Sequence, residues 1–393
     1  MLALRKLAGD RVSLTVVTPE HRFSYRPRTV AAPFELDGTP RIAIADLTTD
    51  VGAELHTGRV AAVDPKRRLV TTVAGSALAY DILLLATGAT PMNALPGSLS
   101  FRGDRGSRAF RSLLGELEQG TVKHLVFALP AGTGWPLPLY ELALLTSAHL
   151  ARSGRVAARL ALVTHEDDPL DLFGRAASDA VRVLLAERGI ELHSGSHPIS
   201  VEAHGVVLSP RGFVRADRVV SLPRLEGPRL QGLRCDPAGF LPTDWFGRVV
   251  GVKHVYAAGD VTAFPVKQGG IAAQQADAAA RAIAAHLGVA VTAARFEPVL
   301  RGLLLTGAAP RFLQAEIGGG HGDTSTVAYT PLWWPPTKVA ARHLGPLIAT
   351  KMGLELPASP RGVQAIPVEV ALAEPGAGEG DRSGPVPVDA PSR

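Results

Sequence analysis

Short apolar runs alternate with helical patterns along most of this chain. Six runs predict strands that are buried on both faces, because they are apolar throughout instead of alternating with polar residues. They occupy residues 11–20, 80–89, 123–130, 159–166, 215–223 and 254–260. Between the fourth and fifth runs, "LFGRAASDAVRVLLAERGIEL" predicts a helix that turns Val181, Leu184 and Leu185 inward and stops at Gly189. This alternation predicts an α/β fold with a parallel sheet covered by helices.

The order of these elements divides the chain into five parts. Residues 1–105 and 226–300 have the character of one nucleotide-binding domain, and residues 106–225 read as a second α/β domain inserted into the first. Residues 301–353 would form a C-terminal cap. The last stretch, residues 354–393, turns to Pro, Gly and Ser and lacks apolar periodicity, so we expect it to be disordered.

Composition excludes several classes of site. The length of 393 residues suggests two or three domains, and 46% hydrophobic and 20% charged residues are ordinary for a globular protein. The single cysteine, Cys235, excludes an intramolecular disulfide, a dithiol redox pair and a cysteine-rich metal cluster. The 12 histidines are scattered without an HExxH pattern, so no metal site is expected.

Charge and hydropathy bear on partners and location. The formal net charge is +5, but basic residues are mixed with acidic ones and never form a run of five, so we expect no nucleic-acid binding. The start "MLALRKLAGD" becomes charged within five residues, unlike a signal peptide. No apolar run approaches the ~20 residues of a membrane-spanning helix. The expected location is the cytoplasm.

The strand at 254–260 and the helix after it carry the candidate ligand-binding chemistry. In an open α/β sheet, ligands lie at the carboxyl ends of the strands. Asp260 ends this strand and can accept hydrogen bonds from a polyol, while Gly259 allows close approach. Gly269 and Gly270 then open a helix whose free N–H groups suit negative charge on a ligand. The alternative is a purely structural role, in which Asp260 caps a turn and the two glycines ease the start of the helix.

Two segments resemble motifs of a known family. "VYAAGDVTAFPVKQGGIAAQQADAAA" is similar to the second FAD-binding motif of the pyridine-nucleotide and sulfide:quinone oxidoreductase flavoproteins, and "YDILLLATGATP" resembles their ATG motif. The similarity runs over most of residues 11–350 and implies two Rossmann-like domains that bind FAD and NAD(P)H. It implies that Asp260 binds the ribityl chain of FAD. It also places Gly269, Gly270 and Ile271 against the N1–C2=O edge of the isoalloxazine, and it adds these residues to the cofactor path: Val60, Ala86, Thr87, Gly88 and Gly259.

The front of the first domain lacks an expected motif. A dinucleotide-binding fold carries G-x-G-x-x-G after its first strand, with a ribose-binding acidic residue about 20 residues later. Glu20 in "VVTPE" suits that acidic residue, and "LALRKLAGD" reads as the tail of the helix that follows the glycines. We expect that the start codon was assigned too far downstream. The alternative is a natural truncation, in which the sheet lacks its central strand and FAD binding is weak or lost.

The segment "LVFALPAGTGWPLPLYELALLTSAHL" occupies the strand–turn–helix position of an NAD(P)H site. Gly132 and Gly134 supply the first half of the fingerprint, and Leu137 stands at the third glycine position. Bulky Trp135 and Pro136 crowd the turn and hinder close approach of a pyrophosphate.

The next strand, at 159–166, ends in three acidic residues. Glu166 is the candidate that holds a ribose, and Asp167 and Asp168 follow it. Solvated turn residues are the alternative.

The electron path follows from what the chain lacks. A persulfide relay or disulfide reduction needs two or more thiols, and a lone Cys235 fits a small buried hydrophobe better. We therefore predict hydride transfer from NAD(P)H to FAD and onward to a quinone-like acceptor. A non-nicotinamide donor and a truncated, non-catalytic flavin-binding protein are the alternatives. Lys267 and Gln268 are the candidate catalytic residues, reaching the flavin pyrimidine ring or the acceptor, with surface polarity as the other interpretation.

Residues 301–316 and 330–353 resemble the region of the same family that covers the flavin and forms a quinone pocket. The following side chains also suit a membrane interface, which would place the protein on the inner face of the cell membrane: Trp333, Trp334, Lys338, Arg342 and Lys351. Packing of both tryptophans under the cap against the FAD domain is the preferred interpretation, because prolines interrupt the apolar face.

Overall fold

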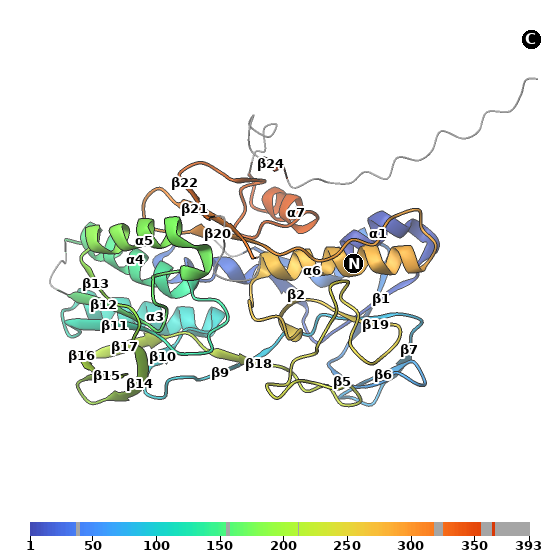
Figure 1. The fold of residues 1–393 in the computed structure, drawn as a ribbon, viewed down its shortest axis with the longest axis horizontal. Coiled ribbons are helices and arrows are strands. Elements are labelled where there is room, and N and C mark those ends of the chain that lie inside the picture. The colour runs from blue at the N-terminus through green and yellow to red at the C-terminus, as the bar shows by residue number, and fades with distance from the viewer. Residues whose placement is uncertain (37–39, 155–157, 211, 318–324, 355–363, 366–393) are drawn as a thin grey trace, which may run out of the picture.

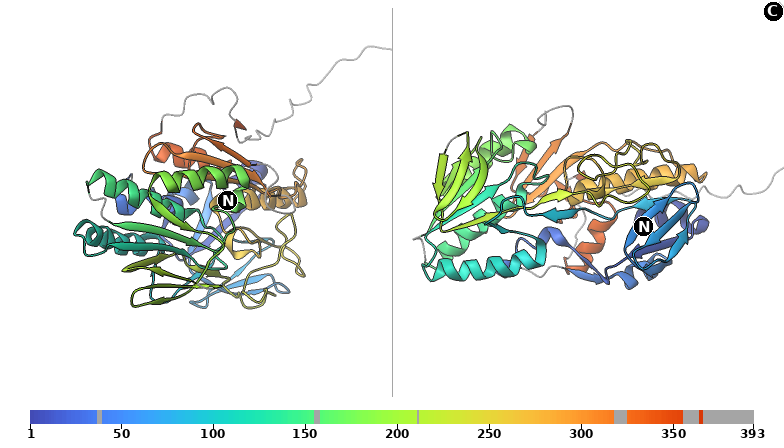
Figure 2. Two further views of the ribbon diagram at one scale, coloured as in Figure 1. Left: turned by 60° about the vertical axis from the view of Figure 1, so that its left-hand side comes forward. Right: turned by 90° about the horizontal axis from the view of Figure 1, so that it is seen from below.

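The computed structural model describes residues 1–36, 40–154, 158–210, 212–317, 325–354 and 364–365. The inserted domain and the first domain lie side by side, with the strands of the cap above the place where they meet (Figure 1). The two further views show the same division, with the cap beside both domains (Figure 2). The predicted α/β fold of two Rossmann-like domains and a cap is confirmed.

The inserted domain contains a parallel five-stranded sheet in the order β10-β17-β11-β12-β13. Its strands are β10 (Leu99–Ser100), β11 (His124–Leu129), β12 (Arg159–Thr164), β13 (Ile190–His193) and β17 (Arg218–Ser221). Its helices are α3 (Gly103–Glu118), α4 (Leu137–Arg152) and α5 (Arg175–Glu187). The strands predicted at 123–130, 159–166 and 215–223 and the helix before Gly189 are all present.

Both faces of this sheet are covered, but by different elements. Leu125 and Phe127 of β11 pack among residues of α3 and α4, whereas Val126 packs against Val206 of a small antiparallel sheet. That sheet consists of β14 (His197–Glu202), β15 (Gly205–Ser209) and β16 (Gly212–Arg215). Successive side chains point to opposite faces, so a strand covered on both sides needs an unbroken apolar run. The predicted helical cover is therefore present on one face, and the antiparallel sheet covers the other.

The first domain divides into two parallel strand pairs. β1 (Leu14–Thr18) pairs with β4 (Ala53–Thr57), and β8 (Leu83–Leu85) pairs with β19 (Val255–Ala257). Among the described residues no ladder joins the two pairs. The prediction that residues 11–20 and 80–89 are buried on both faces was wrong, because β1 and most of β8 are only half-buried. In the described chain β1 and β8 each pair with a single strand, so their apolar side chains have no neighbouring strand beyond the unpaired edge.

The other elements of the first domain surround these pairs. They are α1 (Leu2–Ala8), β2 (Arg22–Ser24), β3 (Arg41–Ala43), α2 (Ile44–Asp50), β5 (Val60–Asp64), β6 (Leu69–Thr72), β7 (Ala77–Ala79), β9 (Thr90–Met92), β18 (Arg224–Glu226) and α6 (Gly269–His286). The helix predicted after the glycine pair is therefore confirmed as α6. Its alanine-rich side packs against Tyr256 of β19 and Leu4 of α1, because small side chains allow close approach.

The cap contains the antiparallel sheet β20 (Val299–Leu304), β21 (Arg311–Glu316) and β22 (Ser325–Ala328), followed by β23 (Trp333–Trp334) and α7 (Leu344–Lys351). Trp333 is fully buried, packs edge-on against Phe312 at 5.1 Å and donates its indole N–H to the Thr337 carbonyl. Lys338 is also buried. The membrane-interface interpretation is therefore wrong for these two residues, and Trp333 packs within the cap itself.

The remaining interface candidates are more accessible, since Trp334 and Arg342 are half-buried and Lys351 is exposed. No helix in the described part of the chain is both long and apolar enough to cross a membrane. The predicted disordered tail lies outside the described residues, apart from Leu354 and β24 (Gln364–Ala365), which pairs with β23.

Candidate functional site

The two FAD-type motifs meet at one edge of the β8–β19 pair. The two strands run parallel, and the Ala258 N–H donates to the Leu85 carbonyl at 3.0 Å, so their carboxyl ends adjoin. Ala86 and Thr87 are exposed at this edge. Gly88 has φ +73°, a conformation that favours glycine. Val60 packs against the apolar cluster that contains Leu85, and so lies beside the ATG segment.

Asp260 lies in the short 3₁₀ helix η5 (Gly259–Val261) directly after β19. Its carboxylate is half-buried and accepts no hydrogen bond from the residues that the structure describes. Burial raises the pKa of Asp260, and the charges of Lys267 and Arg26 oppose that rise. The turn itself is held by the Gly259 N–H, which donates to Gln275 Oε1 at 2.7 Å. The fold therefore holds a carboxylate with free acceptor oxygens in a fixed place.

The start of α6 is shaped by Gln268. Its Oε1 accepts from the Ile271 N–H at 2.8 Å, and its Nε2 donates to the Arg301 carbonyl at 3.0 Å. A Cβ at position 270 would lie 2.8 Å from Gln268 Oε1, so any larger residue there would push this capping amide aside. In the described chain the N–H groups of Gly269 and Gly270 have no partner. The start of α6 therefore presents two free N–H donors, those of Gly269 and Gly270, next to the Ile271 N–H that Gln268 caps.

Lys267 lies between η5 and the inserted domain. Its ammonium donates to the Asp260 carbonyl at 3.2 Å and to the Thr262 carbonyl, and it stands 3.7 Å from the ring centroid of Phe240. Burial lowers its pKa to about 8, while the negative charge of Asp260 opposes that fall. The surface-polarity interpretation of Lys267 and Gln268 is therefore wrong, because both side chains form hydrogen bonds within the protein and Gln268 is buried.

These residues fit FAD. A ribityl chain needs a carboxylate that is not already engaged, and Asp260 provides one. The free N–H groups of Gly269 and Gly270 suit the oxygen-bearing edge of the isoalloxazine, where reduction places negative charge. The half-buried Asp260 carboxylate and the N–H of the buried Gly270 would be costly to leave without a hydrogen-bond partner.

The glycine turn of the inserted domain packs against the FAD-type loop. The Lys267 N–H donates to the Gly134 carbonyl at 3.1 Å, and a Cβ on Gly134 would come within 2.9 Å of the Pro265 carbonyl oxygen. Gly132 has φ +78°, and a Cβ there would meet the side chain of Arg224 at 3.4 Å. Trp135 packs against Phe173 with ring centroids 5.7 Å apart. The turn therefore forms a contact between domains.

The helix after this turn offers few donors. α4 begins at Leu137 with Pro136 as its N-cap, and Pro138 follows. The Leu139 N–H already donates to the Pro136 carbonyl at 2.9 Å. Proline has no N–H, so this helix start lacks most of the groups that usually hold a phosphate.

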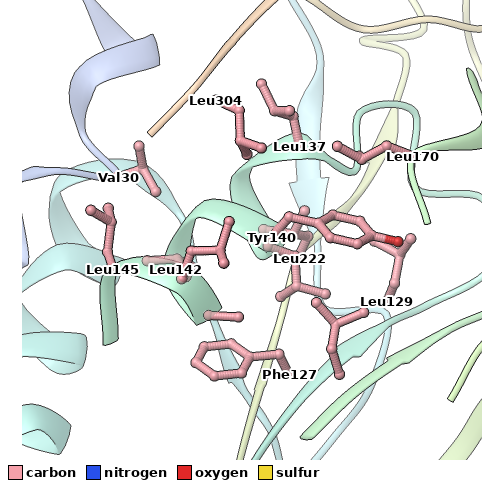
Figure 3. Close-up of a cluster of buried hydrophobic side chains, with 14 of the residues drawn as sticks. Val30, Phe127, Leu129, Leu137, Tyr140, Leu142, Leu145, Leu170, Leu222 and Leu304 are labelled. Atoms are coloured by element: carbon pink, nitrogen blue, oxygen red, sulfur yellow. The ribbon is translucent and has the colours of Figure 1, made fainter. Parts of the chain in front are cut away.

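Glu166 follows β12 and is buried. Its Oε2 accepts from the Tyr140 hydroxyl at 2.5 Å and from the Thr164 hydroxyl at 2.8 Å, and Figure 3 shows the Tyr140 ring within the surrounding apolar cluster. Burial raises its pKa to about 7, against the hydrogen bonds from Tyr140 and Thr164. The solvated-turn alternative is thus wrong for Glu166, while Asp167 and Asp168 are exposed. Ribose binding by Glu166 stays a prediction.

We expect Glu166→Gln to remove a pH-dependent loss of stability. The folded pKa of about 7 lies above the ordinary 4.5, so the folded state holds this proton more tightly, and stability falls as pH rises from about 4.5 to 7. At ~1.4 kcal/mol per unit, the loss is roughly 3 kcal/mol. Between pH 5 and 8, the melting temperature of the variant should therefore change less than that of the wild type. Exposed Glu187→Gln is the control, and equal slopes in all three proteins would contradict the assignment.

Sequence reasoning missed a buried ion pair next to this site. Lys338 Nζ contacts Glu141 Oε1, with side chains 5% and 0% exposed, and the same oxygen accepts from the Leu305 N–H at 2.9 Å. Burial raises the pKa of Glu141 and lowers that of Lys338. The next residue, Val339, lies 3.0 Å from a Cβ built on Gly269. The Glu141–Lys338 pair therefore lies next to the first residue of α6, separated from it by Val339.

Three other residues occupy simpler places. Glu20 is exposed two residues after the end of β1, where its backbone N–H donates to Thr18 Oγ1. Arg26, which no motif indicated, lies close enough to Asp260 for its charge to oppose the rise in that carboxyl's pKa that burial causes. Cys235 is half-buried beside an apolar cluster, and burial raises the pKa of its thiol. This supports the interpretation of Cys235 as a small hydrophobe.

Known proteins share this architecture. Residues 141–284 match the pyridine nucleotide-disulphide oxidoreductase family. An NADH dehydrogenase-like protein of Mycobacterium tuberculosis is 30% identical over 271 residues, covering 66% of this chain and 67% of that protein. The sulfide:quinone oxidoreductase of Aquifex aeolicus has a TM-score of 0.74 at 20% identity over 83% of each chain. A ferredoxin reductase of Rhodopseudomonas palustris has a TM-score of 0.59 at 20% identity over 80% of each.

These comparisons confirm an oxidoreductase with FAD as its cofactor, which was expected from the two motifs. The family match begins within α4, at residue 141, and ends within α6, at residue 284, so it includes most of the glycine-turn helix and the whole Asp260 loop. The chain therefore belongs to the pyridine nucleotide-disulphide oxidoreductase family.

Proposed function

We propose that this protein transfers electrons from NAD(P)H through FAD to a quinone-like acceptor. The hydrogen bond from the Lys267 N–H to the Gly134 carbonyl carries the proposal, because it holds the nucleotide turn of the inserted domain against the loop that leads to the flavin site. Hydride transfer needs donor and acceptor carbons within contact distance, so the two sites must adjoin.

The chain's own residues have distinct parts in this proposal. FAD, when bound, supplies the hydride and electron chemistry. Asp260 binds the polyol, and the N–H groups of Gly269 and Gly270 stabilise negative charge on the pyrimidine edge. Gln268 and Lys267 position these groups through their own hydrogen bonds, so we assign them a positioning role.

Reduction of a quinone-like acceptor takes up two protons with two electrons. A buried pair of titratable groups, Glu141 and Lys338, lies close to the start of α6, which is compatible with such an acceptor.

Rapid mixing with NADH and NADPH tests the donor. We expect the flavin absorbance near its visible maximum to bleach with at least one of them, at a rate that saturates with nucleotide concentration. Bleaching with neither, in a protein whose flavin is still reduced by dithionite, would exclude the nicotinamide donor.

The proline-rich start of α4 favours a second candidate. Because Pro136 and Pro138 remove N–H donors and Leu139 is already engaged, pyrophosphate binding there is weakened. In this candidate a small reduced molecule replaces NAD(P)H, and the inserted domain serves to support the flavin site. Pro136→Gly gives this helix start one more N–H donor. In the second candidate the variant should show no nucleotide-dependent bleaching, whereas an increase in that rate would favour the first candidate.

A further inference from the structure

A small hollow lies between the first domain and the cap. It is partly open to solvent, and three parts of the chain contribute its lining: α1, α6 and the segment that leads into α7. The lining residues are Ala3, Leu7, Asp277, Arg281, Arg342 and His343. A group bound in this hollow would therefore contact the first domain and the cap at the same time.

The hollow is separate from the flavin site. Asp277 and Arg281 lie about two and three turns beyond Gly269, where α6 begins. Gln275, whose amide holds the Asp260 turn, is two residues before Asp277, so it points to roughly the opposite side of the helix. Asp277 therefore faces away from the loop that contains Asp260.

Arg342 has an unsatisfied donor at this hollow. Its Nε is buried without a hydrogen-bond partner, and within the described part of the chain its guanidinium forms no hydrogen bond or ion pair. A buried N–H without a partner costs free energy, which a ligand oxygen would recover. Arg281 is held in place, because its Nε and Nη2 donate to the Thr292 carbonyl at 3.2 and 3.0 Å. The hollow therefore presents one anchored guanidinium and one that lacks a partner.

Cations outnumber acids around the hollow. Arg281 and Arg342 line it, and Lys6 of α1 lies close enough for its charge to act on His343. Among the described lining residues Asp277 is the one acid, and its Oδ1 lies 3.8 Å from His343 Nε2. A single carboxylate leaves the hollow with excess positive charge, which favours an anionic ligand.

We propose that this hollow binds a phosphate group through Arg342 and Arg281. A guanidinium presents a planar fork of N–H donors that matches the oxygens of a phosphate, and two of them can share one tetrahedral anion. The bound anion would link α1 and α6 to the segment before α7. This site is independent of the electron donor and of the electron acceptor.

The acid in the hollow makes the binding depend on pH. Burial raises the pKa of Asp277 to about 6, and the charges of Arg342, the Met1 amino group and Arg281 oppose that rise. Burial and the nearby positive charges lower the pKa of His343. An anion next to both groups favours their protonated forms, so it binds together with protons. Its affinity should therefore fall as the pH rises through about 6.

Sulfate is a suitable probe, because it has the shape of phosphate and keeps its double charge across this pH range. The melting temperature of the flavin-loaded protein is measured against sulfate concentration at pH 5 and at pH 8, with sodium chloride holding the ionic strength constant. We expect a rise that saturates, as for any ligand that binds the folded state. Half-saturation should need roughly 10-fold less sulfate at pH 5 than at pH 8.

Three variants make the test specific. Arg342→Met removes charge-assisted hydrogen bonds and should raise the half-saturating sulfate concentration about 10-fold or more. Arg311→Met is the matched control: this half-buried arginine of β21 stacks on Tyr329, away from the hollow, and its loss should not change the sulfate response. Asp277→Asn removes the repelling charge, so at pH 8 it should bind sulfate about as tightly as the wild type does at pH 5.

The ratio of flavin to protein absorbance separates this site from the cofactor. It should be the same in the wild type and in Arg342→Met, and loss of flavin from that variant would assign Arg342 to a phosphate of FAD instead. A sulfate response no larger than that of chloride, or an equal response in Arg342→Met and the wild type, would also overturn the proposal.

Two sources of the phosphate group can be distinguished once sulfate binding is established. Inorganic phosphate represents a soluble source, and vesicles of phosphatidylglycerol represent a lipid headgroup, with phosphatidylcholine vesicles as the control. Sedimentation with phosphatidylglycerol vesicles that sulfate and Arg342→Met both abolish supports the site and identifies the headgroup. Stabilisation by inorganic phosphate without vesicle binding supports the site and identifies a soluble phosphate.

Discussion

Asp260→Ala should lose most of its flavin during purification. The wild-type carboxylate is half-buried, accepts no hydrogen bond within the described structure and lies at the carboxyl end of β19, where a polyol can reach it. Hydrogen bonds to a charged partner contribute about 1.5–3 kcal/mol, so affinity should fall roughly 10- to 150-fold. The ratio of flavin absorbance to protein absorbance measures the loss directly.

Two further variants make this result specific. Asp260→Asn retains acceptor capacity without the charge, so its flavin content should lie between those of the wild type and the alanine variant. Asp81→Ala removes an exposed carboxylate just before β8 and should leave the ratio unchanged. The alanine substitution breaks no hydrogen bond of the protein, so its melting temperature without flavin should match the wild type. Full flavin occupancy in Asp260→Ala would mean that the cofactor lies elsewhere.

The main features of the site could be predicted because they depend on local pattern and on sheet geometry. Parallel strands end at the same edge, so the ATG segment and Asp260 had to meet once β8 and β19 were identified. The glycine pair marked the start of α6 for a similar reason, since a Cβ at position 270 would displace the capping amide of Gln268. Such features are encoded within a few residues of one another.

Burial of the first domain's strands could not be predicted in this way. An apolar run shows that a strand can be covered, but it does not show whether its second edge is paired. β1 and β8 each have one neighbour in the described chain and remain half-buried. Hydropathy therefore identified the strands correctly and overestimated their burial.

Long-range polar pairs leave even less trace in the sequence. Gln268 and Arg301 are 33 positions apart, and Glu141 and Lys338 are 197 apart. Lys338 follows two tryptophans and two prolines, a composition that also suits a membrane interface, so its sequence neighbours indicated the wrong surroundings. Only the packing of the cap on α4 shows that its charge is matched by a buried carboxylate.

That packing leads to the largest stability effect that we expect. Lys338→Met should leave Glu141 as a buried charge without its partner, on a residue whose Oε2 already has no hydrogen-bond partner. Breaking a buried pair in this way costs about 3–5 kcal/mol, which urea unfolding followed by tryptophan fluorescence can measure. The loss should be accompanied by earlier unfolding of the cap, because Lys338 joins the cap to α4 of the inserted domain.

The double variant Glu141→Leu/Lys338→Met separates the pair from its surroundings. With both charges removed, nothing remains unpaired except the Leu305 N–H, so most of the lost stability should return. Arg175→Met provides the comparison: it breaks an exposed ion pair with Asp179 whose side chains are 93% and 64% exposed, and it should cost less than about 1 kcal/mol. If the double variant is as unstable as Lys338→Met, the cost comes from lost packing in the cap, and the ion pair is not what holds the cap to α4.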